Sequence, residues 1–375
     1  MISVRDKKGQ LTLTFNWIYV LIAGAVILLF FIGIIVKQKS ISEEKLSYDI
    51  SRTLESILTA AAVSEKTLNK IDTSGLKDYT IFFNCEVDGG GFKDVFSGYG
   101  IVGSSATVET PIEPIFAPEE IKTTEIIAWS LPYEYPFKVM DLLMITSSNT
   151  KYYVLGEDSA GFRKELENAT SGSLNIEFFS NPTDDYDTLK AGNNFHIRII
   201  DLDGSSNEIT HMGAVPEDME ELDDAQVSAV SFTSSRNAVY YNKVGNHFED
   251  AGKVEIISLQ PNERDAAKYA VIFAGSKDDY ECNMIKVLKR LEILGEIYLL
   301  KYQELLEYYD PSSPTHNSNC WTLISSETSA LDSFYFVAGS CAVGYENCEK
   351  GQLESLALNI KSLNDDLSEG CIGIY

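Results

Sequence analysis

The longest uninterrupted apolar pattern in the chain lies near its start, where residues 17–36 contain neither a charged side chain nor a proline. About 20 apolar residues, at about 1.5 Å of rise per residue, form a helix as long as the hydrocarbon core of a bilayer is thick. The pattern therefore predicts one transmembrane helix, preceded by a short stub at residues 1–16. No cleavage site of small residues follows it, so we expect a signal-anchor that stays in place.

A second periodicity covers residues 40–69, where apolar side chains recur at steps of three and four. Such spacing puts them on one side of a helix. We predict an amphipathic stalk helix here, packed by its apolar stripe either on the body of the protein or on another copy. The stripe consists of Leu46, Ile50, Leu54, Ile57, Leu58 and Ala61.

Glycine and proline interrupt the pattern between residues 70 and 136, which include Gly89–Gly91 and five of the ten prolines. Proline lacks an amide donor and fixes φ, so we expect only a short strand at Tyr79–Phe83 and no long regular element. Four aromatic side chains lie at the end of this segment, and burial is favoured for them over a recognition surface. They are Trp129, Tyr133, Tyr135 and Phe137.

From residue 137 to 375, short apolar runs alternate with segments of helical periodicity. Strands separated by helices favour crossovers, and the tighter spacing after residue 195 favours hairpins, so we predict an α/β (or α+β) fold. The expected helix there is Ala160–Ala169. The expected strands are Val139–Thr146, Tyr152–Leu155, Leu174–Phe179, Phe195–Leu202, Val227–Phe232, Ala238–Tyr241, Val254–Leu259, Tyr269–Phe273 and Ser333–Val337.

Two further helices are predicted near the C-terminus, at Cys282–Tyr309 and Leu353–Leu367. Two prolines after Asp310 end the first of them. Its apolar positions extend beyond a single stripe, so we expect it to be buried on more than one side. The additional positions are Ile285, Ile293, Ile297 and Leu300.

The formal net charge is −26, and residues 1–39 hold five basic side chains and one acidic one, so the rest of the chain carries −30. An exterior this acidic excludes nucleic acid as a partner, because phosphates need clustered Lys and Arg. Arg5, Lys7 and Lys8 precede the apolar run. By the positive-inside rule they predict a single-pass membrane protein with a cytoplasmic N-terminus and an extracytoplasmic acidic domain, with the lipid bilayer as a partner.

All six cysteines follow the apolar run: Cys85, Cys282, Cys320, Cys341, Cys348 and Cys371. An even number beyond a signal-anchor is typical of disulfides formed in an oxidising compartment, although six cysteines allow fifteen pairings. Buried free thiols are the alternative. Asn168 begins an Asn-Ala-Thr glycosylation pattern, which is consistent with the same location.

Just before the apolar run the chain reads Lys7-Lys8-Gly9-Gln10. This motif, followed by an apolar helix, resembles the class III signal peptide of archaeal type IV pilin-like proteins, over roughly the first forty to seventy residues. The resemblance implies cleavage by a prepilin peptidase after Gly9, which leaves Gln10 as the mature N-terminus. Thr14 stands where the family usually has a glutamate, so fibre assembly does not follow from it. An ordinary signal-anchor with a basic stub is the alternative.

The most enzyme-like pattern is the predicted strand at Ser333–Val337, which runs into a small-residue turn that carries Cys341. A nucleophile elbow has this form, but the second glycine of the motif is displaced and no base is evident. The histidines that would have to supply it are His196, His211, His247 and His316. A structural disulfide with Cys348 explains Cys341 better.

Alternating oxygen ligands in residues 201–208, from Asp201 and Asp203 onward, suggest calcium. Asp203-Gly204 between two apolar runs is also a hairpin signal, and the hairpin interpretation is stronger. The Gly-x-Gly-x-x-Gly at residues 98–103 precedes prolines rather than a helix, so it does not predict a phosphate site. We therefore predict no metal, no cofactor and no catalytic residue.

These patterns together predict a single-pass, membrane-anchored structural or interaction protein of the cell surface, pilin-like at its N-terminus and open to self-association. The alternative is a membrane-tethered extracytoplasmic enzyme or solute-binding domain, with its site at the carboxyl ends of strands in the α/β region. The alternative predicts a pocket that gathers the histidines and a free Cys341.

Overall fold

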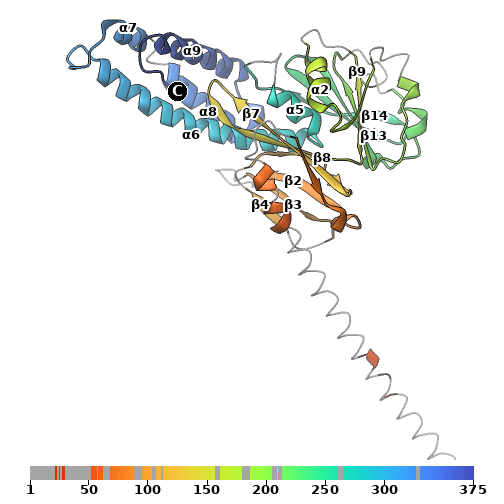
Figure 1. Ribbon diagram of the computed structural model, residues 1–375. Helices are drawn as coiled ribbons and strands as arrows, with labels where there is room; N and C mark the ends of the chain where they lie inside the picture. Colours follow the sequence, from red (N-terminus) through yellow and green to blue (C-terminus); the bar gives the residue numbers. More distant parts are fainter. Residues whose placement is uncertain are drawn as a thin grey trace, which may run out of the picture.

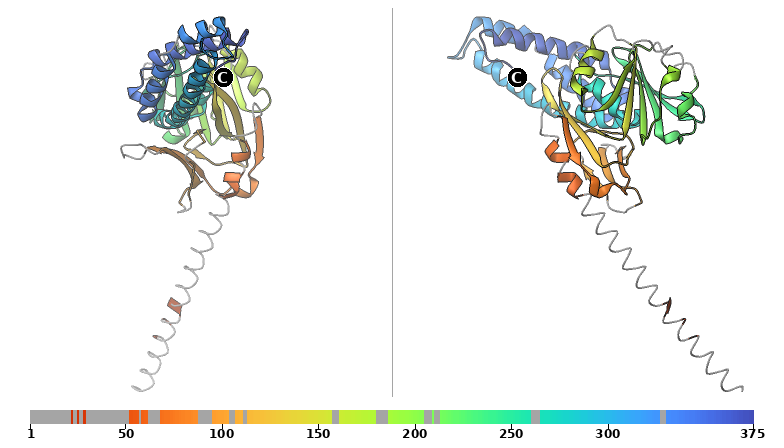
Figure 2. Two further views of the ribbon diagram at one scale, coloured as in Figure 1. Left: turned by 90° about the vertical axis from the view of Figure 1, so that its left-hand side faces the viewer. Right: turned by 45° about the vertical axis from the view of Figure 1, so that its right-hand side comes forward.

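The computed structural model describes residues 68–375 apart from 88–94, 104–106, 111–112, 157–160, 180–185, 205–208, 210–212, 260–264 and 327–329. Earlier in the chain it describes helical residues at 52–56 and 58–61 and four single positions. The described part forms two small sheets, a larger six-stranded sheet and a helical arm (Figure 1). Figure 2 shows that the arm and the six-stranded sheet lie on the same side of the small sheets.

The two small sheets have the strand orders β1–β7–β8–β5 and β4–β3–β2–β6. A shared apolar cluster joins them and includes Ile81, Phe83 and Tyr99. Leu54 and Leu58 of the preceding helical residues are buried in the same cluster. The strands are β1 (Leu68–Asp72), β2 (Ile81–Val87), β3 (Val95–Ile101), β4 (Thr107–Thr110), β5 (Ile115–Phe116), β6 (Glu120–Ile121), β7 (Glu125–Glu134) and β8 (Lys138–Ser147).

The six-stranded sheet has the order β10–β9–β11–β12–β13–β14. Its first four strands are parallel neighbours, and the last two are added as antiparallel hairpins. The chain runs from β9 out to β10 and then returns to β11 on the other side of β9. The strands are β9 (Thr150–Leu155), β10 (Asn175–Phe179), β11 (His196–Asp201), β12 (Val227–Ser234), β13 (Asn237–Val244) and β14 (His247–Glu255).

Different elements cover the two faces of this sheet. Helices α2 (Phe162–Thr170) and α5 (Ala266–Phe273) pack on one face, where Phe162 contacts Tyr269 with ring centroids 5.0 Å apart. Side chains from the connections between β10 and β12, such as Met219, cover the other face. Successive side chains of a strand point to opposite faces, so the inner strands β9, β11 and β12 carry apolar side chains on both faces and are almost wholly buried.

The arm is built on α6 (Lys277–Tyr309), which begins in the body and extends away from it (Figure 1). Helices α7 (Ser318–Ser326), α8 (Ala330–Val343) and α9 (Lys350–Ser368) complete it. Gly295 of α6 lies against Phe334 and Tyr335 of α8, and Gly339 of α8 lies against Glu292.

The prediction of an α/β (or α+β) domain carried on a transmembrane helix is corrected. The described residues form an α+β fold with three sheets. Across the described ranges no helix combines the length and the apolar composition that a bilayer span requires. The long helix α6 carries charged side chains in nearly every turn, and α8 is only 14 residues long. The predicted span at residues 17–36 lies outside the described residues except for Ile22, Ala25, Leu28 and Leu29. The single-pass membrane localisation is corrected with it.

Two predicted strands are helices. Tyr269–Phe273 belongs to α5, and Ser333–Val337 belongs to α8. All eight residues of α5 are buried, so its sequence has no polar face from which a helical period can be recognised. In α8 the buried Leu331, Phe334 and Ala338 do have helical spacing, but it extends beyond the five residues that resemble a strand.

The predicted Asp203-Gly204 hairpin is also wrong, because β11 and β12 are parallel and the chain between them crosses the sheet. Gly204 does adopt a positive φ of 66°, as a turn requires. The strand predicted at Val254–Leu259 is displaced, since β14 ends at Glu255 and the buried Ile256 and Ile257 follow it. Charged residues within β14 interrupt the alternation of apolar and polar side chains, so the sequence did not indicate where this strand lies.

The segment at residues 70–136 is more regular than predicted, because β7 is ten residues long and contains Pro132. β1 pairs only with Glu125–Trp129 of β7, so Pro132 has a strand on one side and needs no amide donor on the other. The boundary drawn at residue 136 falls in the β7–β8 hairpin, and β1 begins at Leu68, inside the range given to the stalk. Burial of the four aromatic residues is confirmed.

The structure pairs all six cysteines. Cys85 of β2 is bonded to Cys282 of α6, Cys320 of α7 to Cys371 near the C-terminus, and Cys341 of α8 to Cys348. The first bond joins residues 197 positions apart, and the last joins residues only 7 apart. Closing a longer loop removes more entropy from the unfolded chain, so the first bond is expected to stabilise the fold most.

We expect the double variant C85S/C282S to lose about 5 kcal/mol of unfolding free energy, and C341S/C348S only about 2 kcal/mol. Denaturant unfolding of the two variants and the wild type, compared at the same pH, measures the difference. A larger loss for C341S/C348S would contradict the loop-length argument.

Candidate functional site

Among the described residues, the histidines and Cys341 do not form a site. Cys341 is buried and bonded to Cys348, so it has no thiol with which to act as a nucleophile. His196 begins β11, His247 begins β14, and His316 follows α6, where its ring Nδ1 is 2.8 Å from the carbonyl oxygen of Tyr309. His211 lies outside the described residues. The version of the alternative that requires a catalytic Cys341 is therefore wrong.

The other predicted positions divide into those described and those not. Asp201 is buried and accepts a hydrogen bond of 2.8 Å from Ser231, and no group of three acidic, histidine or cysteine side chains suited to a metal occurs among the described residues. Asn168 is exposed on α2, inside a helix. Gly9 and Gln10 lie outside the described residues, so processing after Gly9 stays a prediction.

One pair that the sequence did not suggest has the composition of a serine–lysine hydrolase site. The Nζ of Lys286 in α6 donates to Ser97 Oγ in β3 at 2.7 Å, and Ser97 Oγ donates to Asn283 Oδ1 at 2.7 Å. Burial lowers the pKa of Lys286 to about 7, while the charge of Glu113 opposes this shift. A lysine with a lowered pKa beside a serine hydroxyl is a known way to generate a nucleophile.

Access excludes a catalytic role for this pair. Ser97 is 1% exposed and Lys286 is 4% exposed, so a substrate cannot reach the hydroxyl. Asn283 also accepts a 2.9 Å hydrogen bond from the backbone nitrogen of Ile115, and the Cys85–Cys282 bond is adjacent. The group is therefore a polar joint that holds α6 against the small sheets.

Replacing Lys286 by methionine should make the stability of the protein less dependent on pH. Below pH 7 the wild type carries the full cost of burying the charge, and this cost disappears as the pH rises towards 10.5, where the unfolded chain also loses the proton. Relative to K286M, the wild type should gain roughly 1 kcal/mol per pH unit between pH 7 and 10. Denaturant unfolding at three pH values measures this gain, with the exposed Lys253→Met as control. A constant difference between K286M and wild type would contradict the assignment.

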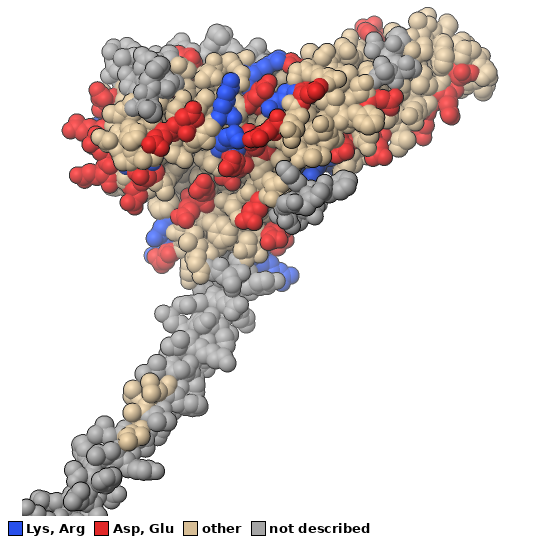
Figure 3. Space-filling view, turned by 180° about the vertical axis from the view of Figure 1, so that it is seen from behind, with Lys and Arg blue, Asp and Glu red and all other residues tan. Residues whose placement is uncertain are grey.

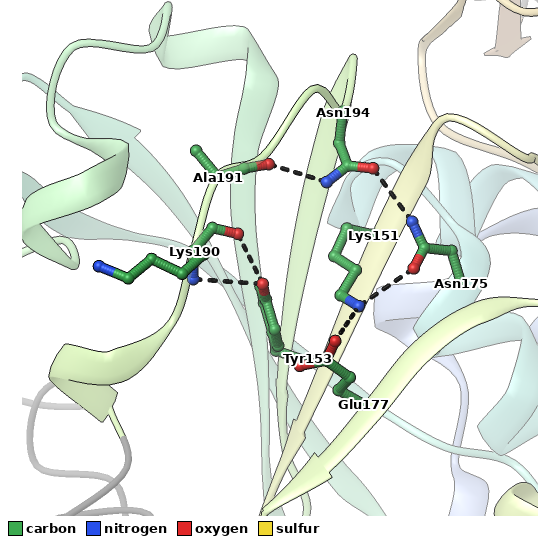
Figure 4. Close-up of polar contacts among 7 residues, drawn as sticks. All are labelled: Lys151, Tyr153, Asn175, Glu177, Lys190, Ala191 and Asn194. Carbon is green, nitrogen blue, oxygen red and sulfur yellow. Dashed lines mark hydrogen bonds and ion pairs between the residues drawn. The ribbon is translucent and has the colours of Figure 1, made fainter.

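A second polar network lies on the six-stranded sheet (Figure 4). Lys151 Nζ donates to Asn175 Oδ1 at 3.0 Å and pairs with Glu177 Oε1 at 2.5 Å. Asn175 in turn donates to Asn194 at 3.0 Å, and the Tyr153 hydroxyl donates to a backbone carbonyl of the same connection. Each of these side chains is engaged with another, so the network fastens β9, β10 and their covering loop together rather than offering free groups to a ligand.

A cleft of about 680 Å³ opens where β11 and β12 begin and β13 ends, against the segment around Pro118. Its volume is in the range of about 300–1,000 Å³ that small-molecule sites occupy. His196 lines it, with ring Nε2 3.4 Å from Ser228 Oγ. Burial lowers the pKa of His196 to about 3, so the ring is neutral at neutral pH. The cleft lies at the amino ends of the parallel strands, opposite to the edge predicted for a ligand.

Behind His196, the buried Arg198 faces the end of a helix rather than a carboxylate. It donates to the carbonyl oxygen of Ala274 at 3.0 Å and to Ser228 Oγ at 3.0 Å, and its guanidinium lies over the Tyr240 ring. Carbonyls at the C-terminus of a helix attract cations, so α5 compensates the buried charge. Arg198 thus has a structural role, and a Ser228–His196 pair without an orienting carboxylate lacks the third member of a catalytic triad.

The most unusual surface is on the arm. Beyond Leu291, the side of α6 turned away from α8 exposes Ile293, Ile297 and Leu300, which are 49%, 52% and 55% exposed. Their spacing of four and three places them in one row, which we call the α6 seam. The expectation that these residues are buried within the chain was wrong. On the face in Figure 3, Asp and Glu are spread over the body and the arm, and Lys and Arg gather where the two meet.

Comparison of the chain with models of protein families, with curated proteins and with solved structures finds no match in any of the three.

Of the α6 seam and the Ser97–Asn283–Lys286 joint, the sequence contained a signal only for the seam. The seam lies within a periodicity that was recognised, but periodicity gives the apolar faces of a helix and not which of them another element covers. The Ser97–Asn283 contact joins residues 186 positions apart, and no local sequence pattern predicts it.

Proposed function

We propose that this chain is a structural protein that acts by self-association, and that the α6 seam is its contact surface. The main observation behind this proposal is the row of three large apolar side chains, each about half exposed, on a long helix. Isolated exposed apolar residues are ordinary, but a contiguous row is typical of a surface that another protein covers. A second copy is the occupant we propose, because the ends of the seam carry complementary charges.

Two features of the arm support a structural role. The Cys320–Cys371 bond ties α7 to the C-terminus beyond α9, and ring contacts among Phe137, Tyr298 and Tyr375 hold the β7–β8 hairpin and the C-terminal residue against α6. A surface held in place this way loses little conformational entropy when it binds.

The double variant I293D/I297D should dissociate the assembly, because buried carboxylates at the contact have no partner. Both side chains are about half exposed in the single chain, so the fold should keep its stability to within about 1–2 kcal/mol of helix propensity. Sedimentation velocity over a range of concentrations measures the association.

The matched control is L358D on α9, where Leu358 is 46% exposed but lies outside the seam. It should associate like the wild type. A wild type that is monomeric at every concentration, or an L358D variant that dissociates equally, would count against the proposal.

The cleft at His196 favours a second candidate function, the binding of a small polar solute. Ala225 lines this cleft and is exposed, so A225W should obstruct it without disturbing the core. We expect a small polar compound that raises the melting temperature of the wild type to have no effect on A225W. Thermal unfolding with a panel of such compounds tests this, and a panel without effect on the wild type rejects the second candidate.

A further inference from the structure

The α6 seam has charges of opposite sign at its two ends. Arg290 precedes its apolar residues, and Glu304 and Glu307 follow them at the same steps of three and four. All three charged side chains are exposed, and none forms an ion pair within the described part of the chain. The seam with its flanking charges reads, in order, Arg290, Ile293, Ile297, Leu300, Glu304 and Glu307.

This order determines which orientation a second copy prefers. If two seams pair in parallel, Arg290 lies opposite Arg290 of the other copy and the glutamates lie opposite each other. If they pair antiparallel, each Arg290 lies within one helical turn of Glu304 and Glu307 of the other copy. Opposite charges at such positions set the orientation of helix pairs, and like charges disfavour the alternative.

We infer that two copies pair antiparallel along α6, across a two-fold axis that passes between Ile297 and Leu300, with Arg290 of each copy beside Glu304 and Glu307 of the other. This inference rests on the proposed self-association and goes beyond it by assigning the residues that meet. Ile297 of one copy then packs on Leu300 of the other, twice, which is the mixed layer of antiparallel coiled coils. The paired length from 290 to 307 is about 25 Å.

The shape of the molecule is compatible with this arrangement. The first half of α6 is buried in the body and the second half extends beyond it (Figure 1). Antiparallel pairing therefore places the two bodies at opposite ends of the paired helices, and the tip of each arm near the base of the other. Parallel pairing would bring both bodies to the same end.

The pairing has a consequence for the size of the assembly. The same surface of both copies takes part, so the contact is isologous and closes at two copies. A closed pair does not extend into a filament through this surface. We therefore expect a dimer, and no larger assembly, at all concentrations at which the full chain is soluble.

Charge reversal tests the orientation. R290E should weaken dimerisation about tenfold, because each dimer gains two clusters of like charge. The variant R290E/E304R/E307R exchanges the signs at both ends and should recover wild-type affinity. Parallel pairing instead predicts no loss in R290E, because like charges then face each other in the wild type and in both variants. Sedimentation equilibrium of the full chain measures the dissociation constants, and far-UV circular dichroism establishes that each variant is folded.

The outcomes separate the orientation from the proposed function. If I293D/I297D dissociates the assembly but R290E binds as tightly as the wild type, or the triple exchange fails to restore the affinity that R290E loses, self-association stands and antiparallel pairing is overturned. If assemblies larger than two copies form through the seam, the inference that the contact closes at two copies is overturned, while self-association stands. If the wild type is monomeric throughout, the proposed function itself fails, and with it the inference.

Discussion

The arrangement of this molecule depends on how the first half of α6 is held. From Tyr280 to Leu288 the helix is almost wholly buried, and α6 touches the small sheets, the six-stranded sheet and the other arm helices. A disulfide at Cys282 and hydrogen bonds at Asn283 and Lys286 fix it to β2, β3 and the start of β5. Because one rigid helix belongs to both the body and the arm, its anchoring sets the direction of the whole arm.

The joint uses polar groups where apolar packing would hold the helix more strongly. Burying the Lys286 ammonium group costs free energy, as the lowered pKa of this group indicates. Its hydrogen bonds to Ser97 and to the carbonyl of Glu113 are directional, however, and they join α6 to β3 and to the segment just before β5. We regard the joint as a device that fixes the register of α6 on the sheets, at some cost in stability.

Arg198 is a second buried cation, and it lies at the other side of the core. A buried helix end leaves backbone carbonyls without partners, and the guanidinium supplies donors to the end of α5 while its charge is favoured there. Both buried cations thus lie where two layers of the fold meet. The exposed seam of α6 differs from them, because nothing in the described chain covers it. In this fold, polar contacts fix the direction of α6, while the face of α6 turned away from α8 stays apolar and exposed. This arrangement fits the proposed self-association.

The sequence by itself determined the local features of this protein. Short apolar runs located β8, β9, β11 and β12, helical spacing located α2, α6 and α9, and the even number of cysteines indicated disulfides, because each of these signals is contained in a few turns or residues. The tertiary structure decided the rest. α5 is a helix because all its sides are buried, and the Asp203-Gly204 turn leads into a crossover because β12 pairs parallel to β11. Which faces of α6 are covered, and that Ser97 meets Asn283, depend on segments far apart in the chain, and a local pattern carries no information about such partners.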